Sequence, residues 1–561
     1  MARTIGIGHQ DFETIRKKDN FYIDKTRFIR EWWQSDDIAT LITRPRRFGK
    51  TLTMSMVEQF FSVKYAGRAD LFQGLDVWKE ESYRHLQGTY PVISLTFANV
   101  KEPDFQMTKQ RINQILTDLY SKNIFLLEGD LLTAEEKTYF HSVTSDMNEV
   151  VATMAIHKMS DFLSRYYGQK VIILLDEYDT PMQEAYVNGY WEELVSFTRS
   201  LFNAAFKTNP YLERAILTGI TRVSKESVFS DLNNLEVITT TSTKYEDSFG
   251  FTESEVYTAL EEYGLSSSKE LVKSWYDGFI FGRKHDIYNP WSIINYLDKQ
   301  RVDTYWANTS SNSLISKLLR ESNKIIKQDF EKLLLDEPLT VQIDEQIVYN
   351  QLSVKDSSVW SLLLASGYLK AENTEFIERT GRTNYVLTLT NREVRIMFEN
   401  IIHDWFSEYD NHYNDFITAL LLGDIKAMNA FMNKVALSTF SFFDTGKHPS
   451  GTSEPERFYH GFVLGLIVDL EERYIIRSNR ESGFGRYDVV LEPKNPHDDG
   501  IILEFKVHDS EDEPTLKDTA INALTQIEKM NYQADLEARG IPADRIRKYG
   551  FAFEGKTVLI C

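Results

Sequence analysis

The chain has 561 residues, a formal net charge of −20, 42% hydrophobic residues and 13% aromatic residues. This length exceeds what one hydrophobic core supports, so we expect about three or four domains, and the apolar content excludes a wholly disordered chain. The negative charge argues against a protein that coats nucleic acid non-specifically, because phosphate backbones bind to positive fields. Two basic stretches, residues 44–50 and 473–486, are local exceptions to this charge.

The single cysteine, Cys561, excludes an internal disulfide and a zinc site built from several cysteines. The first residues contain no apolar signal core, and no run of about eighteen apolar residues occurs. We therefore expect a soluble cytoplasmic protein with no membrane partner.

In chain order, strands and helices alternate as far as residue 245, which predicts a parallel sheet with crossover helices. Residues 1–36 are expected to form a short helix and then, at residues 22–26, a lead-in to the first strand. Apolar runs predict strands at residues 39–42, 90–97, 171–175 and 214–222. Apolar periodicity predicts helices at residues 52–63, 107–119, 154–167 and 190–208.

The first chemical motif follows the strand predicted at residues 39–42 and ends in Gly49-Lys50-Thr51. This is the ending of a phosphate-binding loop. Backbone N–H groups at the helix start hold a triphosphate, while Lys50 reaches its outer phosphates and the Thr51 hydroxyl ligates Mg²⁺. A glycine that ends a loop before an ordinary amphipathic helix is the structural alternative, which the motif alone leaves open.

The loop departs from the usual pattern, which has its first glycine at position 44. This chain has Arg44 there, followed by Pro45, which stiffens the loop. We expect the three arginines of this loop, Arg44, Arg46 and Arg47, to add positive charge beside the phosphates, and we assign Arg46 and Arg47 to nucleotide binding.

The second motif is a run of five apolar residues, 171–175, followed by acids. It predicts a central parallel strand that is buried on both faces and carries carboxylates at its C-terminal edge. Asp176 would hold Mg²⁺ through water and Glu177 would activate the attacking water, while Asp179 is expected at the surface or behind the site. Together with the loop upstream, this favours nucleotide binding over a core strand that ends in an acidic turn.

The strand predicted at residues 214–222 ends in polar residues. Ligands of open α/β sheets gather at the carboxyl ends of the strands. Thr221 or Arg222 would therefore sense the γ-phosphate, with an ordinary surface arginine as the alternative for Arg222.

The middle of the chain is predicted to be mainly helical. Thr252 and Glu255 form a capping box that opens this region. Short strands at residues 359–369 and 385–389 suit a lid or winged-helix module, and the aromatic turns at 275–279 and 288–292 are expected to lock packing rather than bind a ligand. Residues 399–437 are expected to be helical, and residues 438–453 to form a boundary loop.

A second chemical centre lies near the C-terminus. Glu504 and Lys506 share one face of a predicted strand, and Asp488 reaches them from the neighbouring strand. Two carboxylates that hold a divalent cation, with a lysine that orients water or stabilises the scissile phosphate, suit phosphodiester hydrolysis. Glu456, one helix away, would be a further metal ligand or a supporting group. A salt-bridged surface strand is the structural alternative.

The order of predicted elements supports the catalytic interpretation. A helix (456–470), strands (474–476, 487–491 and 501–507), a helix (519–532) and a strand (548–553) follow the plan of a restriction-endonuclease-like core. The chain resembles, over nearly its full length, the bacterial family that joins an AAA-ATPase-like domain to a C-terminal PD-(D/E)xK nuclease-superfamily domain. The resemblance is carried by residues 22–26, 44–51, 174–179, 229–234, 275–278, 288–292, 478–488 and 504–506.

The resemblance implies an α/β protein with four parts. They are a lead-in packed on the ATPase core (1–36), an AAA-like P-loop domain with a parallel sheet (37–245), a helical lid and winged-helix-like region (246–440) and a nuclease-like domain (454–561). Some related nucleases carry a Gln-x-x-x-Tyr motif on the helix after the Glu-x-Lys strand. Here Gln526 is followed by Tyr532 at a wider spacing, so Gln526 is a candidate site residue and Tyr532 a weaker one.

The function that these features predict is an ATP-regulated, Mg²⁺-dependent nuclease that acts on DNA or RNA, with DNA favoured. Defence against foreign DNA is an expectation from the resemblance, and the AAA-like core is compatible with a homo-oligomer. One alternative is a nucleotide-switched protein whose nuclease-like domain binds nucleic acid or a protein without cutting. A third reading is an ATPase with a purely structural C-terminal domain.

Overall fold

The computed structural model describes residues 2–561 apart from 223–228, 230–231, 308–314, 316–317, 320–323, 335, 344–355, 380, 408–412, 440–462, 464–466, 468–469, 472, 483–484, 510–512 and 555–556. The chain divides into two compact units. The first is Met1–Leu318 with Pro338–Arg395, and the second is Leu319–Glu337 with Ile396–Cys561. Among the described residues, no helix has both the length and the apolar character needed to cross a bilayer.

The first unit is built on a five-stranded parallel sheet in the order β2-β3-β4-β1-β5, as the alternating pattern predicts. All residues of β1 and β3 are buried, which fits central strands covered on both faces. β4 lies between β1 and β3, so the phosphate loop and the acidic strand end flank the end of β4. The strands are β1 (Ala39–Thr43), β2 (Val92–Thr96), β3 (Val171–Asp176), β4 (Leu212–Gly219) and β5 (Leu235–Ile238).

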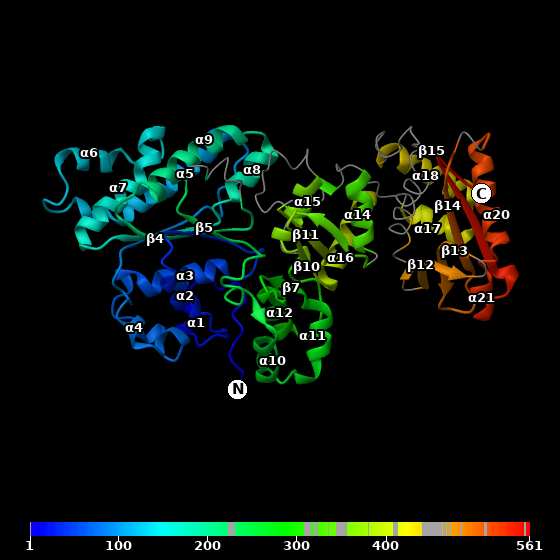
Figure 1. Ribbon diagram of the computed structural model, residues 1–561, viewed down its shortest axis with the longest axis horizontal. Coiled ribbons are helices and arrows are strands. Elements are labelled where there is room, and N and C mark those ends of the chain that lie inside the picture. Colours follow the sequence, from blue (N-terminus) through cyan, green and yellow to red (C-terminus); the bar gives the residue numbers. More distant parts are fainter. Residues whose placement is uncertain are drawn as a thin grey trace. The chain divides into compact units, whose positions relative to one another are not determined.

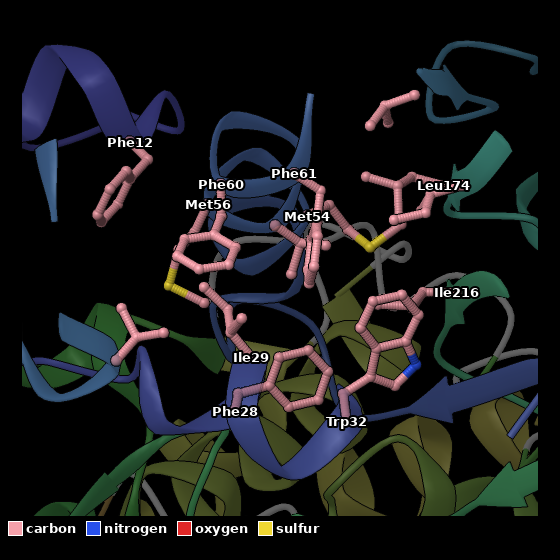
Figure 2. Packing of buried hydrophobic residues seen from close by; sticks show 14 of the residues in the cluster. Phe12, Phe28, Ile29, Trp32, Met54, Met56, Phe60, Phe61, Leu174 and Ile216 are labelled. Carbon is pink, nitrogen blue, oxygen red and sulfur yellow. The ribbon is translucent and has the colours of Figure 1, made fainter. Parts of the chain in front are cut away.

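Helices cover both faces of this sheet, with α2 and α3 on one side and α5, α7 and α9 on the other (Figure 1). The helices of this region are α1 (Phe12–Lys17), α2 (Arg27–Ser35), α3 (Lys50–Phe61), α4 (Glu81–Arg84), α5 (Phe105–Lys122), α6 (Ala134–Ser142), α7 (Glu149–Tyr167), α8 (Thr180–Asn188) and α9 (Trp191–Phe202). Figure 2 shows the aromatic core on the α2–α3 side, where side chains of both helices meet Leu174 of β3 and Ile216 of β4. This core fixes the helix that follows the phosphate loop.

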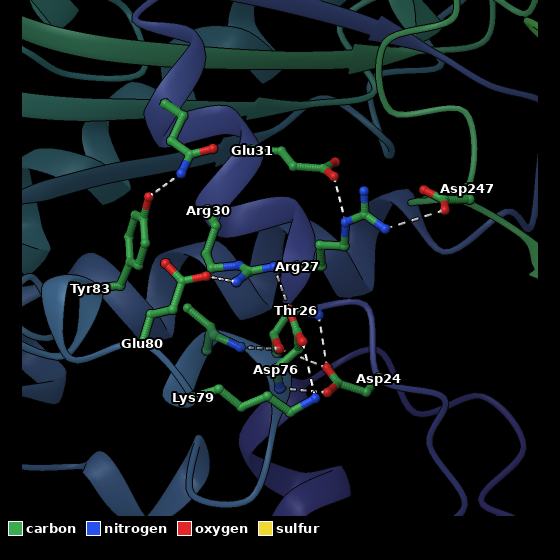
Figure 3. A network of polar contacts seen from close by, with 12 residues as sticks. Asp24, Thr26, Arg27, Arg30, Glu31, Asp76, Lys79, Glu80, Tyr83 and Asp247 are labelled. Atoms are coloured by element: carbon green, nitrogen blue, oxygen red, sulfur yellow. Dashed lines mark hydrogen bonds and ion pairs between the residues drawn. The ribbon is translucent and has the colours of Figure 1, made fainter.

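The predicted lead-in at residues 22–26 does not enter β1. It enters α2, a helix that the sequence interpretation missed, and its polar residues fasten a neighbouring turn (Figure 3). Asp24 accepts hydrogen bonds from the backbone N–H of Thr26 at 2.9 Å and of Asp76 at 2.7 Å. The Thr26 hydroxyl accepts one from the N–H of Val77 at 3.1 Å. These residues therefore join the N-terminal segment to the short helix at Asp76–Trp78.

The rest of the first unit contains two small sheets, β6-β8-β7 and β10-β11-β9. The capping box of Thr252 and Glu255 is confirmed at the start of α10. The strand predicted at residues 359–369 is wrong, because most of it lies in helix α15, and a short apolar run does not distinguish a buried strand from a buried helix. The elements are α10 (Glu253–Glu262), α11 (Lys269–Tyr276), α12 (Pro290–Lys299), α15 (Asp356–Ala365), β6 (Phe251–Thr252), β7 (Phe279–Phe281), β8 (Lys284–Tyr288), β9 (Leu339–Gln342), β10 (Leu369–Ile377) and β11 (Arg382–Leu389).

The second unit is built on a mixed five-stranded sheet in the order β12-β13-β14-β15-β16. Figure 1 shows α20 on one face and α17 and α18 on the other, and the buried clusters agree with this. The strands are β12 (Tyr474–Ser482), β13 (Gly485–Pro493), β14 (Gly500–Val507), β15 (Ile546–Glu554) and β16 (Thr557–Ile560). The helices include α14 (Lys324–Leu334), α17 (Tyr413–Leu422), α18 (Ile425–Thr439), α20 (Leu516–Lys529) and α21 (Ala534–Ala538), and α16 (Arg392–Ser407) begins in the first unit and ends in the second. The whole is a mixed α/β protein, as predicted.

Candidate nucleotide and nuclease sites

The phosphate loop closes on itself through Lys50. Helix α3 begins at Lys50, after Gly49 in the left-handed conformation with φ 82°. The Lys50 ammonium group is buried and donates to the backbone carbonyls of Arg44 at 2.8 Å and Pro45 at 2.9 Å. Burial lowers the pKa of Lys50, although the carboxylates of Glu177, Asp176 and Asp179 oppose this shift. An ammonium held at a loop mouth by neutral carbonyls alone suits a site that receives an anion.

The loop and the acidic strand end meet directly. The Thr51 hydroxyl donates to Oδ2 of Asp176 at 2.7 Å, and the Thr218 hydroxyl of β4 donates to Oδ1. Glu177 follows with a positive φ of 52° and accepts a hydrogen bond from the Thr180 hydroxyl at 3.2 Å. Hydroxyl and carboxylate oxygens at this spacing are the donor set that Mg²⁺ prefers. The residues present therefore fit the divalent ion expected from the sequence.

The sequence leaves open whether Asp179 lies at the surface or behind the site, and the structure excludes the surface position. Its side chain is buried, and Oδ2 accepts from the N–H groups of Ile220 at 2.9 Å and Thr221 at 2.8 Å and from the Thr221 hydroxyl at 2.9 Å. Burial raises the pKa of Asp179, and these hydrogen bonds oppose the rise. Asp179 therefore supports the site from behind, by tying the segment after β3 to the end of β4.

A cavity of about 500 Å³ opens beside the phosphate loop. Neither Asp176 nor Arg222 is among its lining residues. Asp176 is linked to the cavity by its hydrogen bond from Thr51, which lines it. The sensor role of Arg222 stays a prediction. Of the side chains proposed from sequence, the cavity is lined by Arg46, Arg47, Gly49, Lys50, Thr51 and Glu177.

Sequence reasoning missed several of the residues that line this cavity. Residues 6–10 of the N-terminal segment line it, as do Trp291 and Ile294 of α12. The sequence signal in this segment is the pair of glycines at positions 6 and 8, whereas residues 1–36 are expected only to pack on the nucleotide-binding core. The aromatic turn at residues 288–292, expected to lock packing, also contributes Trp291 to the cavity.

The second centre lies in the second unit, on one face of β13 and β14. Val489 pairs with Leu503, so the adjacent Asp488 and Glu504 fall on the opposite face of the two strands. Oδ2 of Asp488 accepts a hydrogen bond from the Phe505 N–H at 2.9 Å. Glu504 is buried, and Lys506 is half-buried two residues further along the same face. As predicted, the side chains of Asp488, Glu504 and Lys506 lie on the same face of these two strands.

Helix α20 covers this face and brings Gln526 to Glu504. The Gln526 amide donates to Oε1 of Glu504 and, at 3.2 Å, to the hydroxyl of Tyr532. The wider spacing to Tyr532 is accommodated because the helix ends at Lys529 and Asn531 turns the chain with φ 52°. The Tyr532 N–H then bonds back to the carbonyl of Ile527 at 3.2 Å. Tyr532, the weaker candidate, thus lies beside the site.

Two further predictions for this unit concern Glu456 and the basic stretch at residues 473–486. Glu456 and most of its predicted helix lie outside the described residues. In the basic stretch at 473–486, Arg473 is paired with Asp498 and Arg477 with Glu492, so carboxylates neutralise part of its charge. Within the described parts of the chain, no group of three or more His, Cys, Asp or Glu side chains is placed to hold a metal. A cation at Asp488 and Glu504 would need further oxygen ligands, from Glu456, water or phosphate.

The first unit has the features of a P-loop nucleotide-binding domain, and the second unit has those of a nuclease-like domain. Residues 6–229 match the family model described as Predicted AAA-ATPase, and residues 454–561 match that of the PD-(D/E)XK nuclease superfamily. The chain therefore joins an AAA-ATPase-like domain to a PD-(D/E)XK nuclease-superfamily domain, which confirms the resemblance. A protein of Azotobacter chroococcum mcd 1, described as an uncharacterized protein in the vnfD 5′ region, is 25% identical over 559 residues, covering 96% of this chain and 95% of that protein.

Proposed function

We propose that this protein is a metal-dependent nuclease controlled by ATP, with DNA favoured over RNA as its substrate. The observation that carries the nucleotide half is the 2.7 Å contact between Thr51 of the phosphate loop and Asp176 of the acidic strand end. The observation that supports the nuclease half is the common face of Asp488, Glu504 and Lys506.

At the nucleotide site, the triphosphate would lie on the N–H groups at the start of α3. Lys50 would exchange its two carbonyl partners for phosphate oxygens, and Arg46 and Arg47 would add positive charge at the mouth of the cavity. Glu177 would orient and deprotonate the attacking water. Mg²⁺, held through Thr51 and Asp176, would supply neutralising charge for the phosphates. The base and sugar would occupy the rest of the cavity, which is also lined by residues 6–10 and Trp291.

At the nuclease site, Asp488 and Glu504 would hold a divalent cation, which supplies Lewis-acid chemistry at the scissile phosphate. Gln526 orients the Glu504 carboxylate through its amide. Lys506 would orient the attacking water or stabilise the charge that develops on the phosphate.

Two other functions remain as alternatives. The net charge of −20 and the ion pairs that neutralise Arg473 and Arg477 favour a nucleotide-switched protein that binds a partner without cutting nucleic acid. The second alternative is an ATPase whose second unit has only a structural role. It predicts phosphate release without cleavage of any substrate.

The test is incubation of the purified protein with linear, circular and single-stranded DNA and with RNA, with Mg²⁺ or Mn²⁺, with and without ATP. Glu504→Ala and Lys50→Ala are run beside the wild type. We expect cleavage that disappears in the first variant and changes in its ATP response in the second. Nucleotide binding without cleavage under any condition would instead support the switched binding protein.

A further inference from the structure

The phosphate loop is anchored from its outer side by residues far along the chain. Arg44, in the position of the usual glycine, is fully buried, and its guanidinium donates to the carbonyls of Thr239 at 2.6 Å and Tyr245 at 3.3 Å. The guanidinium also lies 4.7 Å from the ring centre of Phe281. Burial lowers the pKa of Arg44 to about 9. Arg44 is thus an anchor of the loop and is not among the residues that line the cavity.

Apolar contacts continue this anchoring along the loop. A Cβ atom at Gly367 would lie 2.7 Å from Pro45, so the turn between α15 and β10 approaches the loop closely. The ring of Phe48 lies 4.8 Å from Phe279 and 5.2 Å from Phe281, measured between ring centres. The loop is therefore packed against the region that follows the parallel sheet.

The peptide between Arg46 and Arg47 is held by hydrogen bonds from this same region. The Arg46 carbonyl accepts from the indole N–H of Trp306 at 3.0 Å and from the Asn289 amide at 3.3 Å. Arg47 then adopts a φ of 64°, which is strained for a residue other than glycine. Its guanidinium lies 4.4 Å from the ring centre of Trp291. External donors thus fix a peptide that the loop's own sequence does not favour.

Trp306 is in turn fixed by a buried carboxylate. Its backbone N–H donates to Glu393, which also accepts from the Ala307 N–H at 3.4 Å and the Ser292 hydroxyl at 2.9 Å. Glu393 is fully buried in the first turn of α16. The indole packs between Phe279 at 5.4 Å and Tyr368 at 5.5 Å, measured between ring centres.

We propose that Trp306 is a positioning residue of the nucleotide site, which fixes the Arg46–Arg47 peptide of the phosphate loop and is itself fixed by Glu393. This proposal rests on the proposed binding of a nucleotide at Lys50 and Thr51. Because Glu393 lies in the first turn of α16, a change at the loop would reach the start of that helix through Trp306.

The test is the Trp306→Phe variant, which removes the indole donor and keeps an aromatic ring in the pocket. A matched control is Trp360→Phe, which changes another buried tryptophan of the same unit, in α15. Nucleotide affinity is measured by titration with a fluorescent ATP analogue, and amide hydrogen exchange of residues 44–49 and of α16 is measured with and without ATP. We expect Trp306→Phe to weaken ATP binding by about threefold to tenfold, the effect of one lost neutral hydrogen bond. We also expect amide hydrogen exchange of residues 44–49 to be faster in Trp306→Phe, and the change in exchange of α16 on adding ATP to be smaller. The melting temperature of Trp306→Phe should stay near that of the Trp360→Phe control.

Wild-type affinity and unchanged loop exchange in Trp306→Phe would overturn the proposal. If the wild type itself does not bind the analogue, it is the proposed nucleotide function that fails. Should Trp306→Phe not fold, Ser292→Ala carries the test, because it removes one of the donors to Glu393 with little change in volume. A weakening of ATP binding in Ser292→Ala supports the proposal, and full affinity contradicts it.

Discussion

Lys50 shows how a single side chain prepares the nucleotide site. Its ammonium is buried and donates to two loop carbonyls, and in the proposed complex phosphate oxygens would replace these neutral acceptors with charged ones. We expect Lys50→Ala to weaken ATP binding by roughly tenfold or more, because it removes charge-assisted hydrogen bonds. Calorimetric titration measures the effect. The control is Lys64→Ala at an exposed position, and equal affinities in the two variants would contradict the assignment.

The proposed nuclease site can also be tested at a single side chain, Tyr532. Its hydroxyl accepts a hydrogen bond from Gln526, which in turn donates to Glu504. Tyr532→Phe removes this acceptor while Gln526 keeps its bond to the carboxylate. Cleavage should therefore slow by about twofold to tenfold rather than disappear. Initial cleavage rates give the result, with Tyr474→Phe, at a buried tyrosine of β12, as the control; a loss equal to that of Glu504→Ala would be inconsistent with an indirect role.

Glu393 gives the first unit a pH-dependent stability. Burial raises its pKa from 4.5 to about 7, and the hydrogen bonds from Ser292 and from the backbone N–H groups of Trp306 and Ala307 only partly oppose this. Between these two values the folded state binds more protons than the unfolded state, so stability falls as the pH rises. The effect amounts to at most about 3 kcal/mol.

Glu393→Gln removes this dependence. The melting temperature of the variant, relative to wild type, should rise as the pH increases from 5 to 7.5, because only the wild type then buries a charge. Asp277, whose pKa burial and Asp286 raise to about 7, titrates in both proteins and cancels in the difference. A melting difference that does not change with pH would refute the burial argument. Thermal scans at several pH values provide the measurement.

At the scale of elements, the junction before β7 is held by close contact with the end of β11. Gly278 has a φ of 134°, and a Cβ atom there would lie 1.9 Å from the carbonyl oxygen of Thr390. Gly278→Ala should therefore destabilise the first unit by about 3 kcal/mol or more. Gly264→Ala is the control, since Gly264 has a φ of 71° but open space around it, and should cost about 1 kcal/mol. Thermal unfolding compares them, and equal losses would mean that the contact is not limiting.

Elements with a strong local pattern could be predicted from the sequence. The apolar run of β3, the capping box of α10 and the face shared by Glu504 and Lys506 depend only on residues close together in the chain. Helix α15 could not be distinguished from a strand, because its apolar run carries no clear period. Helix α2 was missed because residues 22–26 suggested an extended entry to β1. The position of Tyr532 depends on where α20 ends, which sequence spacing alone does not give.

At the scale of the whole molecule, the two sites occupy different compact units, so their activities should be separable. We expect Asp488→Asn to abolish cleavage and leave ATP turnover within about twofold of wild type, because sites that share no partner residues usually act additively. Phosphate release and cleavage are measured on the same preparation. Asp498→Asn, which changes the partner of Arg473, serves as the control. If Asp488→Asn also stopped ATP turnover, the hypothesis that the two activities are separable would be wrong.

The sequence by itself determined the two chemical centres, because a phosphate loop, an acidic strand end and a Glu-x-Lys strand are patterns of neighbouring residues. Only the tertiary structure decided what surrounds them. It turned Arg44 into a buried anchor, buried Asp179 behind the site, and brought residues 6–10 and Trp291 to the cavity. It also brought the indole N–H of Trp306 to the carbonyl of Arg46, a residue 260 positions earlier in the chain. These relations depend on contacts between residues far apart in sequence, which no local pattern records.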